Sequence, residues 1–389
     1  MRTILFFSTA ACLIASELPR SPSGDLTVHE WGTFTSVAGN DGEAVQWDTL
    51  GGKDDLPRFV NDFGYRCFKW RLSGTVRMET PVIYFYSPRE VEAHVKVTFP
   101  QGVITEWYPK AEYAVYQKNR KLEPNLNGID TSLRTLTGGI EWTSVRIQPD
   151  ASPPLPVESA ASRYYAARGT DAAPLTAGSQ SEKFLFYRGV GRFAVPLSAL
   201  VGADSKVAVE NRGPEAVPTV ILFENRDGRL GFRNAGSLKD SVTLDAPSLD
   251  GSFAQLRYDL ESALVAQGLY PKEAAAMIET WKDSWFEEGS RLIYIVPSRT
   301  IDAVLPLRIE PAPAVVTRVF VGRIELITPA IQRAVTEAAG KLDWPTLSRY
   351  GRFLDPILAR INRESPSLQW EIDRVRQQSW QAIGPLRCR

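Results

Sequence analysis

The chain has 389 residues, enough for two domains or for one large domain with an ample core. Its 45 basic residues balance 45 acidic ones, so the formal net charge is zero at pH 7. A protein that binds the phosphates of nucleic acid usually has an excess of basic residues. The charge balance of this chain therefore argues against nucleic acid as a partner.

The first sixteen residues have the pattern of a cleaved export signal. Arg2 supplies a positive charge, and residues 4–15 form an apolar run too short to span a bilayer. Polar, proline-rich sequence follows at residues 16–24, and we expect cleavage near Ala15 or Ser16. The alternatives are a buried N-terminal strand and a single anchor helix.

The export signal predicts a periplasmic or extracellular protein. Cys12 offers lipoprotein anchoring as an alternative, but Thr9 stands where a lipidation motif prefers leucine. No later segment approaches twenty apolar residues, so we expect no transmembrane segment once the signal is removed.

Two cysteines remain after the signal, Cys67 and Cys388. An exported protein meets an oxidising compartment, where such a pair often forms a disulfide bond. This bond would close a loop of roughly 320 residues, for which chain entropy gives at most about 5 kcal/mol of stabilisation. The alternative is two unrelated thiols, because sequence does not place the two Cα atoms.

Short alternating segments with frequent turns indicate β structure over residues 25–148. Residues 33–37 and 44–47 flank a Gly-Asn-Asp-Gly turn and predict a hairpin, and residues 93–99 alternate strictly. Residues 149–183 are rich in proline and alanine, but adjacent tyrosines predict a surface loop that packs locally.

A second β region is predicted over residues 184–250, and residues 251–389 form an α+β region that ends in helices. Apolar stripes predict a helical hairpin around Gly268, and three helices are expected at residues 329–342, 345–362 and 367–381, the second kinked at Pro356. The predicted fold class is α+β, with one or two antiparallel β-sandwich-like regions and a helical C-terminal portion.

The most distinctive string is Val-His-Glu-Trp-Gly-Thr-Phe-Thr at residues 28–35. With it, the sequence resembles a family of exported bacterial proteins that carry the same stretch just after the signal. The similarity extends to residues 77–86 and 285–297, so it spans most of the mature chain. The resemblance implies export and assigns no activity, cofactor or functional residue.

The candidate catalytic residues are His29, Glu30, Glu79 and Glu106. His29-Glu30 lacks the second histidine of a helical zinc site, and neighbours on a strand face opposite sides. His29 and His94 could bind a metal with a carboxylate only if distant segments converge. The alternative is a hydrogen-bonded structural histidine, and no cofactor is predicted.

Carboxylates that neighbour aromatic residues suggest a glycan site, because sugar rings stack on indoles and glycoside hydrolysis uses two carboxyls. The candidate ligand-binding residues are Trp31, Trp47 and Trp107, with Trp70 and Trp142 as further members of an aromatic platform. The alternative is that these indoles fill a β core.

The sequence therefore favours a non-catalytic envelope or extracellular protein that binds a glycan or a protein. A secreted hydrolase, with or without a metal, that uses His29 and nearby carboxylates is the alternative. The first hypothesis rests on the signal, the aromatic strands and the lack of a recognisable catalytic motif.

We predict that the mature N-terminus lies close to residue 16. Cells that express a C-terminally tagged chain are fractionated, and the purified protein is analysed by N-terminal sequencing. Protein found in the cytoplasm with Met1 intact would contradict export.

We also predict a peptide pair joined through Cys67 and Cys388. Mass spectrometry of a non-reduced digest of the periplasmic protein detects this pair, and a reduced digest is the control. Free thiols at both positions would show that the bond does not form.

Overall fold

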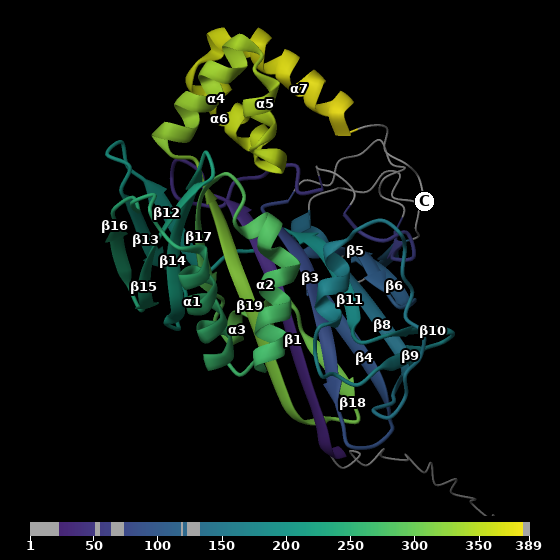
Figure 1. Ribbon diagram of the computed structural model, residues 1–389. Coiled ribbons are helices and arrows are strands. Elements are labelled where there is room, and N and C mark those ends of the chain that lie inside the picture. Colours follow the sequence, from purple (N-terminus) through teal and green to yellow (C-terminus); the bar gives the residue numbers. More distant parts are fainter. Residues whose placement is uncertain (1–22, 51–54, 64–73, 118–119, 123–132, 384–389) are drawn as a thin grey trace, which may run out of the picture.

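The computed structural model describes residues 23–50, 55–63, 74–117, 120–122 and 133–383. These residues form an α+β fold, which confirms the predicted class. Strands dominate the structure, and all seven α-helices of the described chain follow residue 252 (Figure 1).

Sixteen strands of the described chain form one large sheet, in which the continuous order is β10-β9-β8-β5-β11-β3-β1-β19-β17-β14-β15. The remaining strands attach at its side, β2 to β5, β6 and β4 to β8, β7 to β6 and β18 to β4. The members are β1 (Ser23–Val37), β2 (Asn61–Asp62), β3 (Val76–Tyr86), β4 (Val91–Pro100), β5 (Gly102–Tyr108), β6 (Glu112–Gln117), β7 (Arg120–Leu122), β8 (Leu136–Ile147), β9 (Leu175–Ala177), β10 (Gln180–Glu182), β11 (Leu185–Gly191), β14 (Val217–Arg226), β15 (Arg229–Leu238), β17 (Gly289–Ile295), β18 (Leu307–Glu310) and β19 (Pro313–Leu326). A small second sheet contains β12 (Leu197–Val201), β13 (Val207–Asn211) and β16 (Ser241–Leu244).

The helices follow in chain order, and short 3-10 turns occur between some elements. The α-helices are α1 (Phe253–Ala266), α2 (Pro271–Trp285), α3 (Ser298–Val304), α4 (Pro329–Lys341), α5 (Trp344–Ser348), α6 (Leu354–Glu364) and α7 (Gln369–Ile383). The 3-10 turns are η2 (Leu133–Thr135), η3 (Arg163–Arg168), η4 (Gly351–Phe353) and η5 (Pro366–Leu368).

The large sheet draws neighbouring strands from distant parts of the sequence. β1 pairs with β3 on one side and with β19 on the other, and β11 lies between β3 and β5. Most pairs are antiparallel, as predicted, but β1 and β19 run parallel from Thr27 opposite Val315 to Val37 opposite Glu325. The long connection between these two strands permits a parallel pair.

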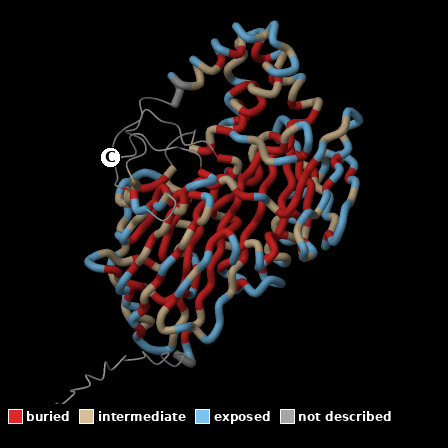
Figure 2. The backbone as a smooth tube through the Cα atoms, turned by 180° about the vertical axis from the view of Figure 1, so that it is seen from behind, coloured by how far each residue is buried: buried red, intermediate tan, exposed pale blue. Residues whose placement is uncertain are grey.

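Each face of the sheet is buried against a different layer, because alternate residues of a strand point to opposite sides. On the first face, Val28 and Phe320 pack in a cluster with residues of β4, β8 and β13. On the second face, Trp31 and Val319 pack with α1 and α2. The buried residues follow the strands through the body of the molecule (Figure 2).

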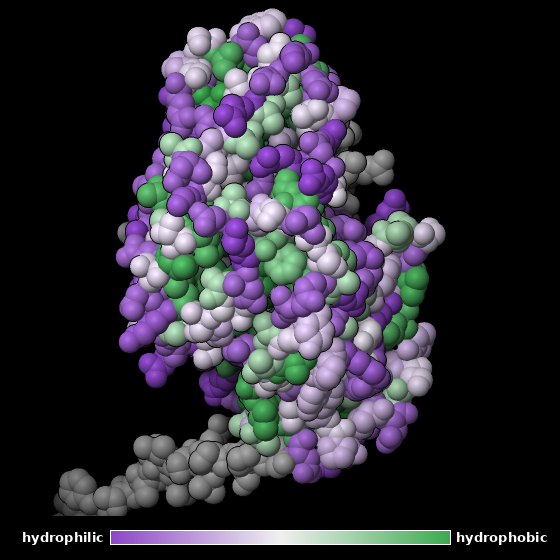
Figure 3. All heavy atoms as spheres, turned by 60° about the vertical axis from the view of Figure 1, so that its left-hand side comes forward, coloured by the Kyte–Doolittle hydropathy of each residue, from purple (hydrophilic) through white to green (hydrophobic). Residues whose placement is uncertain are grey.

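The C-terminal helices form a separate layer at one end of the sheet (Figure 1). Ile331 of α4, Ile357 of α6 and Val375 of α7 build this core. Val37 of β1 and Trp47 belong to the same cluster, so it joins the helices to the sheet. On the face shown in Figure 3, hydrophobic residues are scattered among hydrophilic ones.

The helical hairpin is confirmed in detail. α1 and α2 pack together on the second face of the sheet, and Gly268 between them has φ of +104°. This left-handed conformation suits glycine at a helix end. The segment over residues 149–183 is not a loop throughout, because it contains η3 and the strands β9 and β10 of the large sheet. Tyr164 of η3 is buried among aromatic rings.

Two other local predictions are wrong. The second arm of the expected hairpin at residues 44–47 forms isolated bridges only, one of them from Ala44 to Ala38. The helix expected at residues 345–362 is divided into α5, η4 and α6, and Pro356 lies in the first turn of α6. Proline is tolerated there because that turn leaves its N–H groups unpaired.

Several predictions fall outside the described residues. They are the signal at residues 1–16 with Cys12, the cysteines Cys67 and Cys388, and Trp70. Among the helices that the structure describes, none has the length and apolar character needed to cross a membrane.

Candidate functional site

His29 connects the central strand to helix α2. Its Nδ1 lies 2.7 Å from Oε2 of Glu273, the third residue of the helix. Glu273 also accepts hydrogen bonds from the backbone N–H of Tyr270 and from the hydroxyl of Tyr86. Only 2% of His29 is exposed, and the rings of Tyr86 and Tyr270 pack against it. His29 is thus part of the cap that fixes α2 on the sheet.

Glu30 faces the opposite side of the sheet from His29. Its carboxylate accepts hydrogen bonds from Nε of Arg318 at 2.6 Å and from the hydroxyl of Tyr187. Glu30 is fully buried, so this ion pair replaces the water that the charge has lost. The two neighbours therefore do not share one site.

Gly32 of the same string is required by packing. A Cβ atom at this position would lie 2.7 Å from the ring of Phe320 and 3.1 Å from Cα of Pro81. Phe320 lies on β19 directly opposite Gly32. The ring of Phe320 therefore packs directly against the backbone at Gly32, which leaves no room for a side chain.

His94 lies in a separate polar cluster, which is partly exposed at the surface. Its Nε2 lies 2.7 Å from Glu141, which also accepts a hydrogen bond from Lys96. His29 and His94 therefore contact different carboxylates, Glu273 and Glu141. Within the described ranges, no three histidine, cysteine or acidic side chains are grouped as a metal site would require.

Of the predicted aromatic platform, the four tryptophans that the structure describes, which include Trp142, are buried. Trp31 is fully buried between the sheet and α2, and Trp47 packs against Phe353 of the C-terminal layer. Trp107 stacks on Tyr113 at 4.9 Å and is 7% exposed. In this structure the three indoles fill the core and leave no face for a sugar ring.

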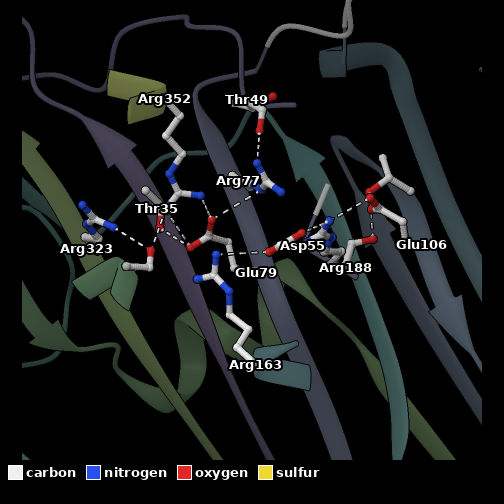
Figure 4. A network of polar contacts seen from close by, with 12 residues as sticks. Thr35, Thr49, Asp55, Arg77, Glu79, Glu106, Arg163, Arg188, Arg323 and Arg352 are labelled. Carbon is white, nitrogen blue, oxygen red and sulfur yellow. Dashed lines mark hydrogen bonds and ion pairs between the residues drawn. The ribbon is translucent and has the colours of Figure 1, made fainter. Parts of the chain in front are cut away.

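Glu79 lies at the centre of a buried polar network (Figure 4). It accepts hydrogen bonds from Thr35 at 2.9 Å and from both terminal nitrogens of Arg352, and Nε of Arg77 lies 3.4 Å away. Burial opposes ionisation, but Arg352 and Arg77 outweigh it and lower the pKa of Glu79 from 4.5 to about 2. Glu79 is therefore ionised at neutral pH and does not suit the role of a general acid.

Arg188 extends the network to Asp55 and Glu106. It donates hydrogen bonds to Asp55 at 2.9 Å and to Glu106 at 3.1 Å, and Arg163 lies 3.4 Å from Asp55. Burial opposes ionisation of Asp55, but Arg188 above all lowers its pKa below the usual range. Of the four predicted catalytic residues, Glu79 and Glu106 are both counter-ions in this region, but they pair with different arginines.

On its other side, the network reaches α2 and β17. Arg323 and Arg352 both donate to the hydroxyl of Ser284 at 3.0 Å. Arg323 also donates to Glu325, which accepts a second hydrogen bond from Arg291 at 3.0 Å. The network therefore joins the sheet, helix α2 and the C-terminal layer.

Arginines outnumber carboxylates in these ion pairs. The arginine network, as we name it, contains six arginines and five carboxylates among the described residues: Arg77, Arg163, Arg188, Arg291, Arg323 and Arg352, with Asp55, Glu79, Glu106, Glu287 and Glu325. Burial and the nearby Arg188 lower the pKa of Arg77, and burial and Arg291 lower that of Arg323. Added negative charge would therefore be favoured here.

Buried polar atoms beside the arginine network lack partners. Oγ1 of Thr33, Nε1 of Trp281 and Nε of Arg323 make no hydrogen bond within the part of the chain that the structure describes. Thr33 lies opposite Glu79 across β1 and β3, and Arg163 lies 5.4 Å above the Trp281 ring. Two of these three groups are donors only, so they match a ligand with acceptor oxygens.

None of these arginines was predicted from the sequence as a site residue. The available signal was the presence of arginines inside otherwise apolar strands, as in β19, where Arg318 and Arg323 interrupt a β-branched run. A charge inside such a strand needs a buried counter-ion. Their partners lie far away in sequence, and only the folded chain identifies them.

Comparison of the chain with protein-family models and with curated proteins finds no match.

We expect Glu79→Gln to lower the free energy of unfolding at pH 7 by about 3 to 5 kcal/mol, because it leaves buried arginines without their counter-ion. The folded-state pKa of Glu79, about 2, lies below its ordinary value of 4.5. Its contribution is therefore complete above pH 4.5 and is lost as the pH falls towards 2. Urea unfolding across this range measures the difference between the two proteins.

The matched control is Glu43→Gln, which removes a half-exposed carboxylate paired with Arg212. This variant should change stability by less than about 0.5 kcal/mol. A destabilisation by Glu79→Gln that stays constant from pH 7 to pH 2 would contradict the assigned role of Glu79.

Proposed function

We propose that this chain is an exported, non-catalytic binding protein of the cell envelope or the extracellular space. In this proposal the arginine network holds an acidic group of its ligand, which is a glycan or an envelope protein. The observation that carries it is the excess of arginines over carboxylates among the described residues, next to buried donors that make no hydrogen bond within that part of the chain.

The chemistry of the network supports recognition of an oxyanion. Guanidinium groups present planar pairs of N–H donors that match carboxylate, sulfate and phosphate oxygens. Arg163 is the most exposed of the six arginines, with a side chain 29% exposed, and the side chain of its partner Asp55 is 20% exposed. An acidic group that enters beside them would approach Trp281, which lies below Arg163.

The arrangement gives less support to a secreted hydrolase. His29 serves as a helix anchor, Glu30 is paired with Arg318 on the other face, and Glu79 is held ionised. Glycoside hydrolysis requires a carboxylic acid that keeps its proton, which calls for a raised pKa. The opposite shift at Glu79 favours binding over this chemistry.

The protein purified from the periplasm should bind acidic glycans, or an acidic envelope protein, in preference to neutral glycans. A glycan array with polyuronates, sulfated glycans and neutral glycans is combined with pull-down from envelope fractions. Binding should weaken between 0.05 and about 0.5 M salt, because the contact is electrostatic and partly exposed.

Arg163→Gln should lower the affinity for the acidic ligand about tenfold, as expected for the loss of one charge-assisted hydrogen bond. Arg299→Gln is the control, because Arg299 is 80% exposed and lies outside the network. Equal binding of acidic and neutral glycans, or empty results in both screens, would overturn the proposal.

A further inference from the structure

A second place in the molecule has a buried hydrogen-bond donor without a partner among the described residues. A cavity of about 580 Å³ lies between α3, β18 and the first half of β19, on the sheet face opposite the arginine network. Its volume falls within the range of small-molecule sites. Arg318, whose side chain is only 8% exposed, is one of the residues that line it.

The guanidinium of Arg318 is fixed on two of its three nitrogens. Nε donates to Glu30 at 2.6 Å, and Nη1 donates to Asp302 at 2.8 Å. Nη2 is buried and makes no hydrogen bond within the described residues. Glu30 in turn accepts a hydrogen bond from the hydroxyl of Tyr187. This contact fixes the Glu30 carboxylate, which orients the guanidinium of Arg318.

Asp302 already places a carboxylate at this guanidinium. Its side chain is 65% exposed, whereas Glu30 on the other side of Arg318 is fully buried. An exposed ion pair contributes little free energy, so Asp302 can be displaced by a competing carboxylate. A ligand carboxylate in place of Asp302 would accept the hydrogen bond that Nη1 of Arg318 now donates to Asp302.

About half of the cavity wall is aliphatic, and the rest is formed by Ser298, Asp302, Arg308 and Arg318. Leu307, Ile309, Pro313 and Val316 line it, and Val316 remains 47% exposed although it is a β-branched residue in a strand. A ligand that covered Val316 would remove this apolar surface from water. The body of the ligand should therefore be aliphatic.

We propose that this cavity binds a small aliphatic carboxylate, whose carboxylate group pairs with Arg318 in place of Asp302. The site is separate from the arginine network, and the inference does not rest on the proposed function.

Hexanoate is the test ligand, and isothermal titration calorimetry with the mature protein measures its affinity. Hexan-1-ol, which lacks the charge, should bind at least tenfold more weakly, and hexylamine should not bind. Acetate should also bind more weakly than hexanoate because it lacks the apolar body. No binding of hexanoate, or equal binding of hexanoate and hexanol, would overturn the proposal.

Two variants on the exposed side of the cavity test the mechanism without removing Arg318, whose loss would leave Glu30 buried and unpaired. Asp302→Asn removes the competing carboxylate and should raise the affinity for hexanoate about fivefold to tenfold. Val316→Glu places a negative charge in the cavity and should lower the affinity more than tenfold. Thermal unfolding confirms that both variants are folded.

Controls separate this cavity from the arginine network. Asp171→Asn, which changes an exposed aspartate paired with Lys272, should leave hexanoate binding unchanged, and so should Arg163→Gln. A loss of binding in Arg163→Gln with no effect of Val316→Glu would place hexanoate in the arginine network and refute the cavity. Weaker binding by Asp302→Asn would refute displacement of Asp302.

Discussion

Strand β1 lies between β3 and β19 at the centre of the large sheet, and its parallel pairing with β19 brings Thr27 opposite Val315. The buried polar contacts on both faces of the sheet depend on this register. It places Glu30 opposite Arg318, and it places Thr35, which binds Glu79, opposite Arg323. A shift by one residue would turn every side chain of β1 to the other face and would separate these partners.

The charges buried along this strand constrain the fold in a way that apolar packing does not. An ion pair inside a protein loses hydration, and it is tolerated only when its geometry and additional hydrogen bonds compensate. Around Glu79 the arginine network meets this condition over three layers, because Arg352 of the C-terminal layer donates to Glu79 and to Ser284 of α2. Nε of Arg323, in contrast, has no partner among the described residues. Helix α2 is fixed at both ends, by Glu273 near its start and by Ser284 near its end.

Much of the fold could be predicted from local patterns. The helical hairpin around Gly268 followed from apolar stripes on either side of a glycine, which has a positive φ in the structure. The candidate site could not be predicted in this way. His29 and Trp31, which the sequence predicted as functional residues, are buried in the core. The arginines of the network are spread along the sequence from Arg77 to Arg352.

By itself, the sequence determined the fold class and the alternation that assigns His29 and Glu30 to opposite faces of a strand. These properties depend on neighbours within a few residues, where the periods of strands and helices apply directly. Only the tertiary structure decided which faces are buried and which charges become partners. Glu79 obtains its lowered pKa from Arg352, a residue of another layer, and Glu30 obtains its counter-ion from β19. Electrostatic partners are set by distance in space, which the order of residues along the chain does not encode locally.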